Sequence, residues 1–518
     1  MTLKKITVFF MALGLVASAI HPANAADAFN PDAGAKPESG GVFQIGETGV
    51  NVPFSGLGAG SKVSNDSWTC TSTKDPECDF SKLKSMGGES VFPPCETELQ
   101  ENCIVSLAIT NRDGIFVDAA LTRSLQGMTF PADKSLNYIA GSTPSIWSAP
   151  ESPSSSGTTD YMVLVRMHQA RYLGEKKFNP KHFIASVVPY REQAGDYKAP
   201  SQITVSNDPF QNGPTKSYAA GGHDECVWTE AGKCGVAQDF AAGTRVKLVI
   251  RLPKELSGWL QGRLKDPLVQ AKSFSETNSE LTVEAEPALV QRFKHTIVGK
   301  ENVSETEKQF VRENGMSGSW DSFTTWANAS RPEAFKFIRH FKTAAGDKAA
   351  GANTYWNFGS SHLTAQGSPC LSDNSKILGI VTTNSMAYDG GVPKYSRGSL
   401  NYKVAGMHLE ADGATEVLGS YDLVMRSEVA RCLYGFSKAP LSATISISGA
   451  GDRTIATTVV SEKNGWLKLA AYGFTFSEKT IKVKLTQKKT TITCVAPGKK
   501  SKKVTGFSPK CPKGFKKR

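Results

Sequence analysis

Ten cysteines constrain the fold of this 518-residue chain more than any other feature of its sequence. They form three pairs spaced eight residues apart, followed by four more widely spaced residues: Cys70, Cys78, Cys95, Cys103, Cys226, Cys234, Cys370, Cys432, Cys494 and Cys511. An even, clustered set of this kind favours disulfides, here up to five. Zinc is the alternative, but the chain has no CxxC motif, and seven intervening residues do not suit a zinc knuckle. We therefore predict disulfides and no metal site.

Spacing leaves the connectivity open, since the first four cysteines alone can pair in three ways. Bonds between neighbours would leave Cys370 and Cys432 as a long-range bridge. Cys494 and Cys511 would then close a loop in the C-terminal tail. In the chain-entropy model, closing that loop is worth ~3 kcal/mol.

The N-terminus has the three-part layout of a secretory signal. Residues 1–5 form a short basic region, residues 6–20 are apolar, and Ala23 and Ala25 place small side chains at a cleavage site. The apolar run has 15 residues, fewer than the ~20 that a membrane-spanning helix needs. We expect residues 1–25 to be removed on export, leaving a mature chain without a transmembrane segment.

The positive charge of the chain is concentrated at its C-terminus. Residues 482–518 contain thirteen Lys and Arg residues and no Asp or Glu, whereas the formal net charge of the whole chain is +12. Everything before this tail therefore sums to about −1, and to about −3 without the two lysines of the signal. A terminal cluster of cations favours polyanionic partners. The residues expected to bind a polyanion are Lys499, Lys500, Lys502, Lys503, Lys510, Lys513, Lys516, Lys517 and Arg518.

Apolar and polar residues alternate along most of the mature chain. Val246, Leu248, Ile250 and Leu252 form one face of a segment whose other face carries basic residues. Further segments with strand character are 161–172, 183–190, 400–408, 416–425, 441–447 and 481–485. A period of two indicates antiparallel sheets with one dry face. The sequence thus predicts a mainly β protein with two antiparallel β-sandwich-like regions joined by a small helical segment, and a short disulfide-pinned basic tail.

Residues 286–350 break this pattern. Ser304 with Glu307, and Ser330 with Glu333, have the spacing of capping boxes, and Pro332 suits a first helical turn. A third helix is predicted over 287–297, with its apolar residues on one side. The expected organisation is a signal peptide (1–25), a flexible segment (26–60), a β-rich domain (61–285), a helical insert or bridge (286–350), a second β-rich domain (351–486) and a basic tail (487–518).

The C-terminal part of the chain contains a series of short motifs. They are GSYDLVM at 419–425, ARCLY at 430–434, NGWL at 464–467 and GFTFS at 473–477, followed by TITC at 491–494, PKCP at 509–512 and GFKK at 514–517. In these motifs the chain resembles uncharacterised exported proteins of actinobacteria. The motifs span about a quarter of the chain. The resemblance implies an envelope or extracellular location, and it implies no reaction.

Catalytic motifs are weak or absent in the sequence. It contains no GxSxG, HExxH, GxxxxGK[ST] or EF-hand pattern. Ser360, Ser361 and His362 place hydroxyls beside an imidazole, but neighbours in sequence rarely reach the ~3 Å that a nucleophile and its base require. His223 and Cys226 offer metal ligands, but Cys226 is better used in a disulfide. No catalytic residue, metal or cofactor is assigned from the sequence.

Aromatic residues offer a further binding hypothesis. Within forty residues lie Trp320, Phe323, Trp326, Tyr355, Trp356 and Phe358. Such rings stack on the apolar faces of sugars, although large aromatic side chains more often fill cores. These three tryptophans are the candidate glycan-stacking residues.

Two functions from different classes follow. The first is a secreted or cell-envelope-associated structural or binding protein, retained on anionic wall polymers or acidic lipids by its basic tail. Nucleic acid is not expected as a partner of an exported protein. The alternative is a secreted hydrolase that acts on polysaccharide with a site between the two β regions.

Overall fold

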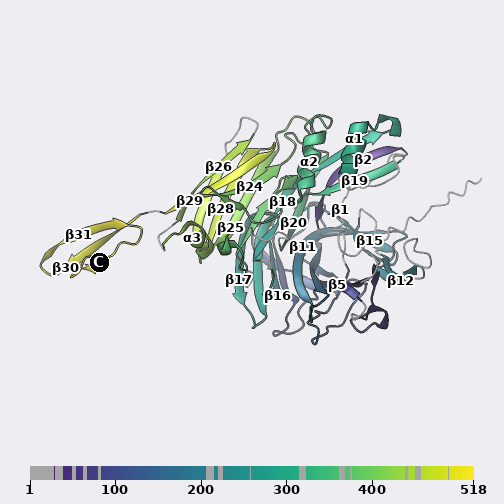
Figure 1. Cartoon of the computed structure of the whole chain (residues 1–518), viewed down its shortest axis with the longest axis horizontal. Helices are drawn as coiled ribbons and strands as arrows, with labels where there is room; N and C mark the ends of the chain where they lie inside the picture. Colours follow the sequence, from purple (N-terminus) through teal and green to yellow (C-terminus); the bar gives the residue numbers. More distant parts are fainter. Residues whose placement is uncertain are drawn as a thin grey trace, which may run out of the picture.

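The protein is mainly β, with three α-helices in the part that the structure describes (Figure 1). The computed structural model describes residues 28–29, 39–48, 54–61, 67–79, 83–205, 215–219, 226–256, 258–313, 322–360, 368–373, 376–437, 441–449, 457–487 and 489–518. The predicted signal peptide therefore lies outside the described residues. So do Trp320, His223, Ser361 and His362.

One long, curved sheet runs through the body of the protein. Each strand is hydrogen-bonded to the next, and all neighbours are antiparallel except β17 and β21. In spatial order its strands are β4 (Ser67–Thr69), β3 (Gly56–Ser61), β5 (Leu83–Val91), β10 (Asp160–Tyr172), β11 (Asn179–Ala194), β20 (Gly351–Ser360), β17 (Trp259–Ser273), β21 (Gly379–Thr383), β25 (Leu418–Arg426), β28 (Trp466–Thr475) and β27 (Thr457–Lys463). We call it the long sheet. Its ladder crosses the expected domain boundary at residue 350, since β20 and β21 pair with β11 and β17, which precede that boundary.

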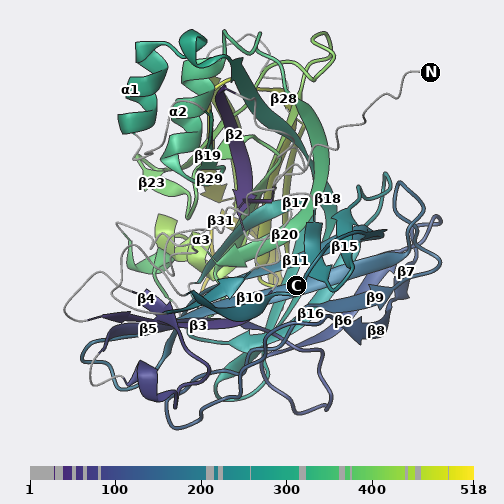
Figure 2. The same ribbon diagram turned by 90° about the vertical axis from the view of Figure 1, so that its right-hand side faces the viewer.

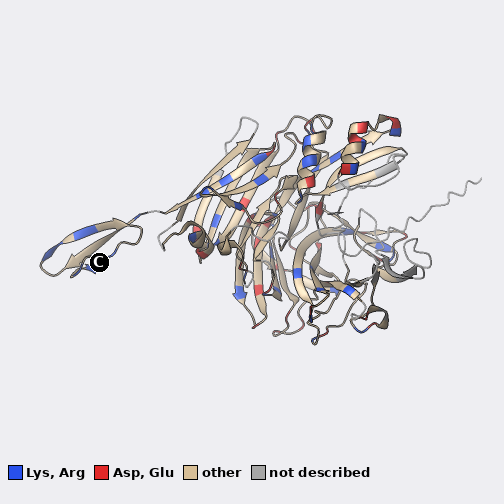
Figure 3. Cartoon of the chain, in the orientation of Figure 1, with Lys and Arg blue, Asp and Glu red and all other residues tan. Residues whose placement is uncertain are grey.

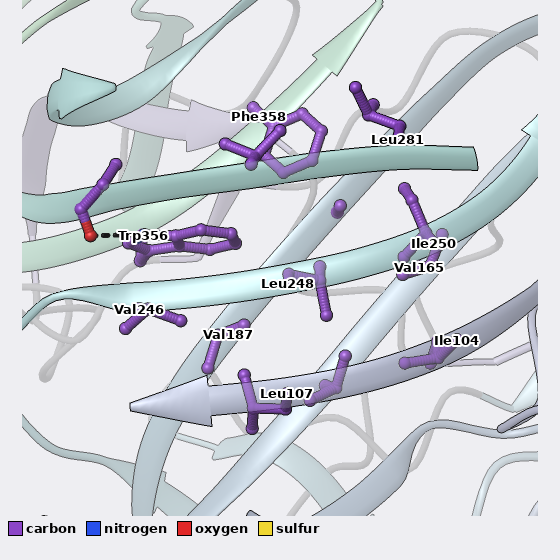
Figure 4. Packing of buried hydrophobic residues seen from close by; sticks show 14 of the residues in the cluster. Ile104, Leu107, Val165, Val187, Val246, Leu248, Ile250, Leu281, Trp356 and Phe358 are labelled. Atoms are coloured by element: carbon purple, nitrogen blue, oxygen red, sulfur yellow. Dashed lines mark hydrogen bonds between the residues drawn. The ribbon is translucent and has the colours of Figure 1, made fainter. Parts of the chain in front are cut away.

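A second sheet covers one end of the long sheet. Its strands are β7 (Phe116–Asp118), β6 (Cys103–Thr110), β16 (Val246–Pro253), β18 (Asn278–Val298) and the C-terminal half of β17. Alternate residues of the two sheets meet in the largest hydrophobic core, where Leu107 and Leu248 lie opposite Val187 and Trp356 (Figure 4). The Trp356 indole N–H donates to the Ala285 carbonyl at 3.1 Å. The prediction of a strand from the alternating residues Val246, Leu248, Ile250 and Leu252 is thus confirmed, and all four side chains are buried.

The other end of the long sheet forms a second sandwich. β22 (Ala387–Tyr388), β23 (Lys394–Ser396), β24 (Ser399–Ala405), β29 (Lys479–Gln487) and β26 (Leu441–Gly449) make the covering sheet. Tyr402 and Val483 from this sheet pack with Leu423, Leu469 and Phe474 from the long sheet. Helix α3 (Ser427–Tyr434) follows β25 and ends at Gly435, which has a left-handed conformation. The two sandwich-like regions predicted from the period of two are present.

Two helices and a short sheet close one side of the molecule (Figure 2). In Figure 2, helices α1 (Glu305–Glu313) and α2 (Pro332–Phe341) lie on one side of β19 (Ser322–Asn328), which pairs in parallel with β2 (Gly40–Thr48). Phe337 and Phe341 of α2 pack on Phe43 of β2 and Phe293 of β18. These contacts bury the apolar face of α2 and hold the helices against the body.

The helix predicted over 287–297 is wrong, because these residues form the second half of β18. They pair with β20 and then with β2. Ala288 and Val290 are buried, whereas Leu289 is 50% exposed. Apolar residues at helical spacing can also lie on the two faces of a strand. Here the backbone pairing with β20 and β2 makes the segment a strand rather than a helix.

The capping prediction holds for one helix and fails for the other. At α1, the Ser304 N–H and hydroxyl donate to Glu307 Oε2 at 2.7 Å, and the Glu307 N–H donates to Ser304 Oγ at 3.3 Å. At α2, Arg331 occupies the cap position and Pro332 begins the helix. The Ser330 hydroxyl donates instead to Asn328 Oδ1 at 2.9 Å. Because the Ser330 hydroxyl bonds within this local turn, it does not cap α2.

The segment 26–60, expected to be flexible, contains two strands that the body uses. β2 pairs with β18 and β19, and β3 pairs with β5. Phe43 is fully buried, as is Leu57. Glycine is the commonest residue of β3 and has no side chain. The sequence of β3 therefore lacks the alternation of apolar and polar residues that would have predicted a strand. β1 (Ala28–Phe29) pairs with the end of β2.

Smaller elements complete the fold. β8 (Ala120–Ser124) and β9 (Ser145–Ser148) extend the edge of β10, and β14 (Cys226–Glu230) and β15 (Lys233–Ala237) extend β11. β12 (Ser201–Val205) and β13 (Thr215–Ala219) form a separate hairpin. Single 3₁₀ turns are η1 (Pro76–Cys78), η3 (Lys300–Asn302) and η4 (Pro369–Leu371).

All ten cysteines are in disulfides. The bonds are Cys70–Cys78, Cys95–Cys103, Cys226–Cys234, Cys370–Cys432 and Cys494–Cys511. Neighbours in sequence therefore pair, and the long-range bond ties η4 to α3. The prediction of a disulfide framework is confirmed.

Candidate functional site

The basic tail folds into a three-stranded ribbon. β30 (Thr490–Ala496) lies between β31 (Lys499–Gly506) and β32 (Lys516–Lys517). Residues 507–515 connect β31 to β32, and the Cys494–Cys511 bond fastens this connection to the central strand. The ribbon extends away from the body (Figure 1). The sequence predicted the bond and the charge, but it did not predict the three strands.

The two faces of the ribbon differ, because partners across a sheet point to the same side. Cys494 lies opposite Lys502 on one edge strand and Lys517 on the other. Cys494 is fully buried, and its bond to Cys511 places the connection on this side. We call this the covered face; its residues are Ile492, Cys494, Lys499, Lys502, Val504, Phe515 and Lys517.

The opposite side has no such covering. Thr493 pairs with Lys503, and Val495 pairs with Lys516. The Arg518 N–H donates to the Thr493 carbonyl at 2.9 Å, which continues the ladder to the end of the chain. We call this the open face; its residues are Thr491, Thr493, Val495, Lys503, Thr505, Lys516 and Arg518.

All nine cations predicted to bind a polyanion have exposed side chains. Lys499 and Lys502 lie over the Phe515 ring, with Nζ 5.9 Å and 5.1 Å from its centroid. The ring attracts these ammonium groups and so orients them. Blue residues follow the ribbon in Figure 3, whereas red residues appear only on the body. The ribbon therefore carries positive charge that no acidic side chain of its own neutralises.

At the base of the ribbon, the described residues include one hydrogen bond to the body: the Ser437 hydroxyl donates to the Phe507 carbonyl at 3.3 Å. Within the tail, Lys489 Nζ lies 5.6 Å from the centroid of the Phe507 ring. Phe507 is 45% exposed. The fold of the ribbon thus depends mainly on its own ladder and its disulfide.

A second candidate site lies where the long sheet meets β16 and β18. Asp422 of β25 is fully buried. Its Oδ1 accepts from the Tyr472 hydroxyl at 2.5 Å, and its Oδ2 accepts from the Asp266 N–H at 3.3 Å. Burial raises the pKa of Asp422 to about 7, although the Tyr472 hydrogen bond and the Lys468 charge both lower it. The side chain is therefore largely protonated below neutral pH.

Asp266 differs from Asp422 in exposure and in charge. Its side chain is 42% exposed, and its backbone has a left-handed conformation with φ of 53°. Arg245 Nη1 contacts Asp266 Oδ2 at 2.9 Å, and Lys468 Nζ contacts Oδ1. Burial raises the pKa of Asp266, but Lys468 and Arg245 outweigh burial and hold this pKa below its usual value. Below neutral pH, Asp422 is therefore largely neutral while its neighbour Asp266 stays ionised.

A third cluster lies on one face of β5, β10 and β11. Glu89, His168 and His182 occupy one row across the three strands. Glu89 Oε1 lies 3.0 Å from His168 Nδ1, and Oε2 lies 3.4 Å from Arg166 Nε. The two imidazoles stack with centroids 4.9 Å apart. Burial raises the pKa of Glu89, but Arg166 and His168 together lower it to about 2.

None of these clusters has the ligand geometry of a metal centre. Within the described residues, no group of three or more His, Cys, Asp or Glu side chains is arranged to hold a metal ion. Among the helices of the described part, none is long and apolar enough to cross a membrane.

The glycan-stacking prediction fails for Trp356, which is 1% exposed and belongs to the main core. Trp356 is buried because β20 lies in the middle of the long sheet, where both faces are covered. Trp326 lies on β19, and Trp320 lies outside the described residues. Ser360 is also buried, and its Oγ accepts from the Phe183 N–H at 2.8 Å. Its hydroxyl thus has a structural role.

Sequence reasoning missed Asp422 and Glu89. Asp422 lies within the quoted GSYDLVM motif, where one acidic residue is surrounded by apolar ones in a strand that is buried on both faces. That context is the only sequence signal that marks it. No signal marks Glu89, since its partners come from residues 166 and 168, far along the chain.

No protein-family model matches the chain, and no curated protein matches it. The ribbon and the charged clusters of the body are therefore the features from which function is inferred.

Proposed function

We propose that this is an exported binding protein, held at the cell envelope through its C-terminal ribbon, which binds anionic wall polymers. One observation carries the proposal. Nine exposed cations lie on a ribbon closed by Cys494–Cys511, in a stretch without a single acidic residue. Clustered ammonium groups gain free energy when they displace the counterions condensed on a polyanion.

Three further features support the proposal. The mature body has a net charge of about −3, so the body adds no attraction for an anionic surface. The ribbon extends from the body (Figure 3), so a bulky polymer can reach it. The signal-like N-terminus and the five disulfides agree with an oxidising compartment. Acidic lipids carry the same kind of charge and are a second possible surface for the ribbon.

The test is sedimentation of the mature protein with isolated cell-wall sacculi, at low salt and at 1 M salt. The full chain should sediment at low salt and remain in solution at high salt, because the Debye length falls to ~3 Å at 1 M. A chain ending at Gln487 should stay in solution under both conditions. If this shorter chain still sediments at high salt, the body itself recognises the wall and the proposal is wrong.

A matched control separates ribbon charge from total charge. In one variant, eight lysines and the arginine of the ribbon become Gln. In the other, eight exposed lysines and one exposed arginine of the body become Gln: Lys74, Lys84, Lys134, Lys176, Lys177, Lys198, Lys394, Lys403 and Arg397. Both lose nine charges. Only the ribbon variant should lose binding to sacculi or to vesicles containing acidic lipid.

A secreted polysaccharide hydrolase is the second candidate, and Asp422 and Asp266 favour it. A carboxyl kept neutral beside one kept ionised is the pattern of paired carboxyl groups in glycosidases. Both lie where the two β regions meet. The test is release of reducing sugar from cell-wall polysaccharide by the mature protein and by Asp422→Asn. Equal release by the two proteins, or none, would count against the hydrolase.

A further inference from the structure

The three strands of the ribbon place three cations on each face, in different settings, and the connection across the covered face adds Lys510 and Lys513. Lys499, Lys502 and Lys517 are on the covered face, and Lys503, Lys516 and Arg518 are on the open face. If total charge alone governed binding, the two sets would be equivalent. Their surroundings indicate that they are not.

On the covered face, the lysines border the connection between β31 and β32. The ammonium groups of Lys499 and Lys502 both lie over the ring of Phe515, and these cation–π contacts orient the two side chains. The Cys494–Cys511 bond places residues 507–515 across this side. A long polymer would meet an uneven surface, and it would have to compete with the ring for the two ammonium groups.

On the open face, the cations surround a polar surface. Lys503 and Lys516 flank the central strand from opposite edges, and Arg518 follows opposite Thr493. The hydroxyls of Thr491 and Thr505 are 2.7 Å apart and hydrogen-bonded. Because one hydroxyl donates to the other, the second keeps its own O–H for an external acceptor.

This combination defines a class of ligand. Ammonium and guanidinium groups bind anions, and threonine oxygens can accept hydrogen bonds from the O–H groups of a ligand. A polymer with hydroxyls beside its anions satisfies both, whereas inorganic polyphosphate satisfies only the first. We propose that the open face is the binding surface of the ribbon and that its ligand is a hydroxylated anionic polymer. This inference rests on the proposed function.

Two triple variants of the full mature chain test the choice of face. Lys503→Gln/Lys516→Gln/Arg518→Gln changes the open face, and Lys499→Gln/Lys502→Gln/Lys517→Gln changes the covered face. Each removes three charges. The probe is a soluble poly(glycerol phosphate), titrated at several salt concentrations, and mass spectrometry checks that the Cys494–Cys511 bond is intact. The open-face variant should bind at least tenfold more weakly, and the covered-face variant at most threefold.

The salt dependence gives a second readout. Loss of three contacts should reduce the slope of log K against log salt by about 2, if each contact releases roughly 0.7 ions as for single-stranded polyanions. That reduction is expected for the open-face variant only. Equal losses of affinity and equal slopes for both variants would overturn the choice of face, while the proposed function would stand. Absence of binding by the unmodified protein would overturn both.

Thr493→Val tests the hydroxyl requirement, since Thr493 lies between Lys503 and Arg518 on the open face and valine keeps its shape. This variant should bind poly(glycerol phosphate) about threefold more weakly and bind inorganic polyphosphate unchanged. A polyuronate provides a second hydroxylated source, with carboxylate in place of phosphate. If Thr493→Val weakens none of the hydroxylated polymers, or weakens polyphosphate equally, the ligand class is wrong.

Discussion

Glu47 and Arg263 are 216 residues apart in sequence and form a two-pronged ion pair in the interior. Arg263 Nε donates to Glu47 Oε2 at 2.9 Å, and Nη2 donates to Oε1 at 2.5 Å. Arg263 is fully buried, and its Nη1 also donates to the carbonyls of Thr383 and Ser385. The pair thus joins β2 and β17 to the loop that follows β21.

Arg263→Met should lower the free energy of unfolding by about 3–5 kcal/mol, because it leaves a buried carboxylate and two carbonyls without their donor. Chemical denaturation with fluorescence detection measures this change. The double variant Glu47→Gln/Arg263→Met should recover part of the loss, since the unpaired charge is gone. A double variant that is as unstable as the sum of both single variants would show that the two side chains are not coupled.

Asp422 should make the protein less stable as pH rises. Its pKa is about 7 in the folded state and 3.8 as the ordinary value, so between these pH values the folded state holds a proton that the unfolded state has lost. The unfolding free energy should therefore fall by up to about 1.4 kcal/mol per pH unit in this window. Asp422→Asn should remove this contribution to the slope.

Denaturation curves between pH 4 and pH 8 measure this effect. Tyr472→Phe is the control, because it removes a hydrogen bond that lowers the pKa of Asp422. The loss of stability should then move to higher pH. An unchanged slope in Asp422→Asn would mean that Asp422 is ionised in the folded protein throughout this range.

Glu89 should act in the opposite direction. Its folded pKa of about 2 lies below the ordinary 4.5, so its contribution is present above pH 4.5 and is lost as pH falls toward 2. Glu89→Gln should cost about 2 kcal/mol at pH 7, after a reduction for partial exposure. The difference from the unmodified protein should vanish near pH 2. Glu151→Gln, at an exposed site, should show no such pattern.

The ribbon should unfold locally without its disulfide. Cys494 and Cys511 are 17 residues apart, and loss of the loop constraint should cost ~3 kcal/mol in the chain-entropy model. Cys494→Ser/Cys511→Ser should unfold the backbone around the ribbon lysines and so allow rapid tryptic cleavage there, while the melting temperature of the body stays the same. Cys70→Ser/Cys78→Ser is the counterpart in the body, and its ribbon should resist trypsin as before.

The sequence predicted the architecture well where side chains alternate. The strands β16, β24, β26 and β29 follow from that period. The disulfide framework follows from the cysteine spacing, and helices α1 and α2 follow from the polar and apolar residues of 304–341. The prediction failed where a partner strand decided the structure. Residues 287–297 carry apolar side chains at helical spacing, but β2 and β20 bind their backbone.

The charged clusters could be predicted only in part. The basic residues of the ribbon are visible in the composition of the tail, but the distribution of its lysines between two faces needs the register of β30, β31 and β32. Asp422 and Asp266 are 156 residues apart. Their opposite pKa shifts arise from tertiary burial and from Lys468 and Arg245, which a linear pattern does not reveal.

The long sheet has a mechanical consequence. Because β20, β17 and β21 carry one uninterrupted ladder from the first half of the chain into the second, a hinge between the two halves would require several backbone hydrogen bonds to break together. The body should therefore move as one rigid unit, so that a ligand in contact with both halves has to fit the surface that the long sheet already presents.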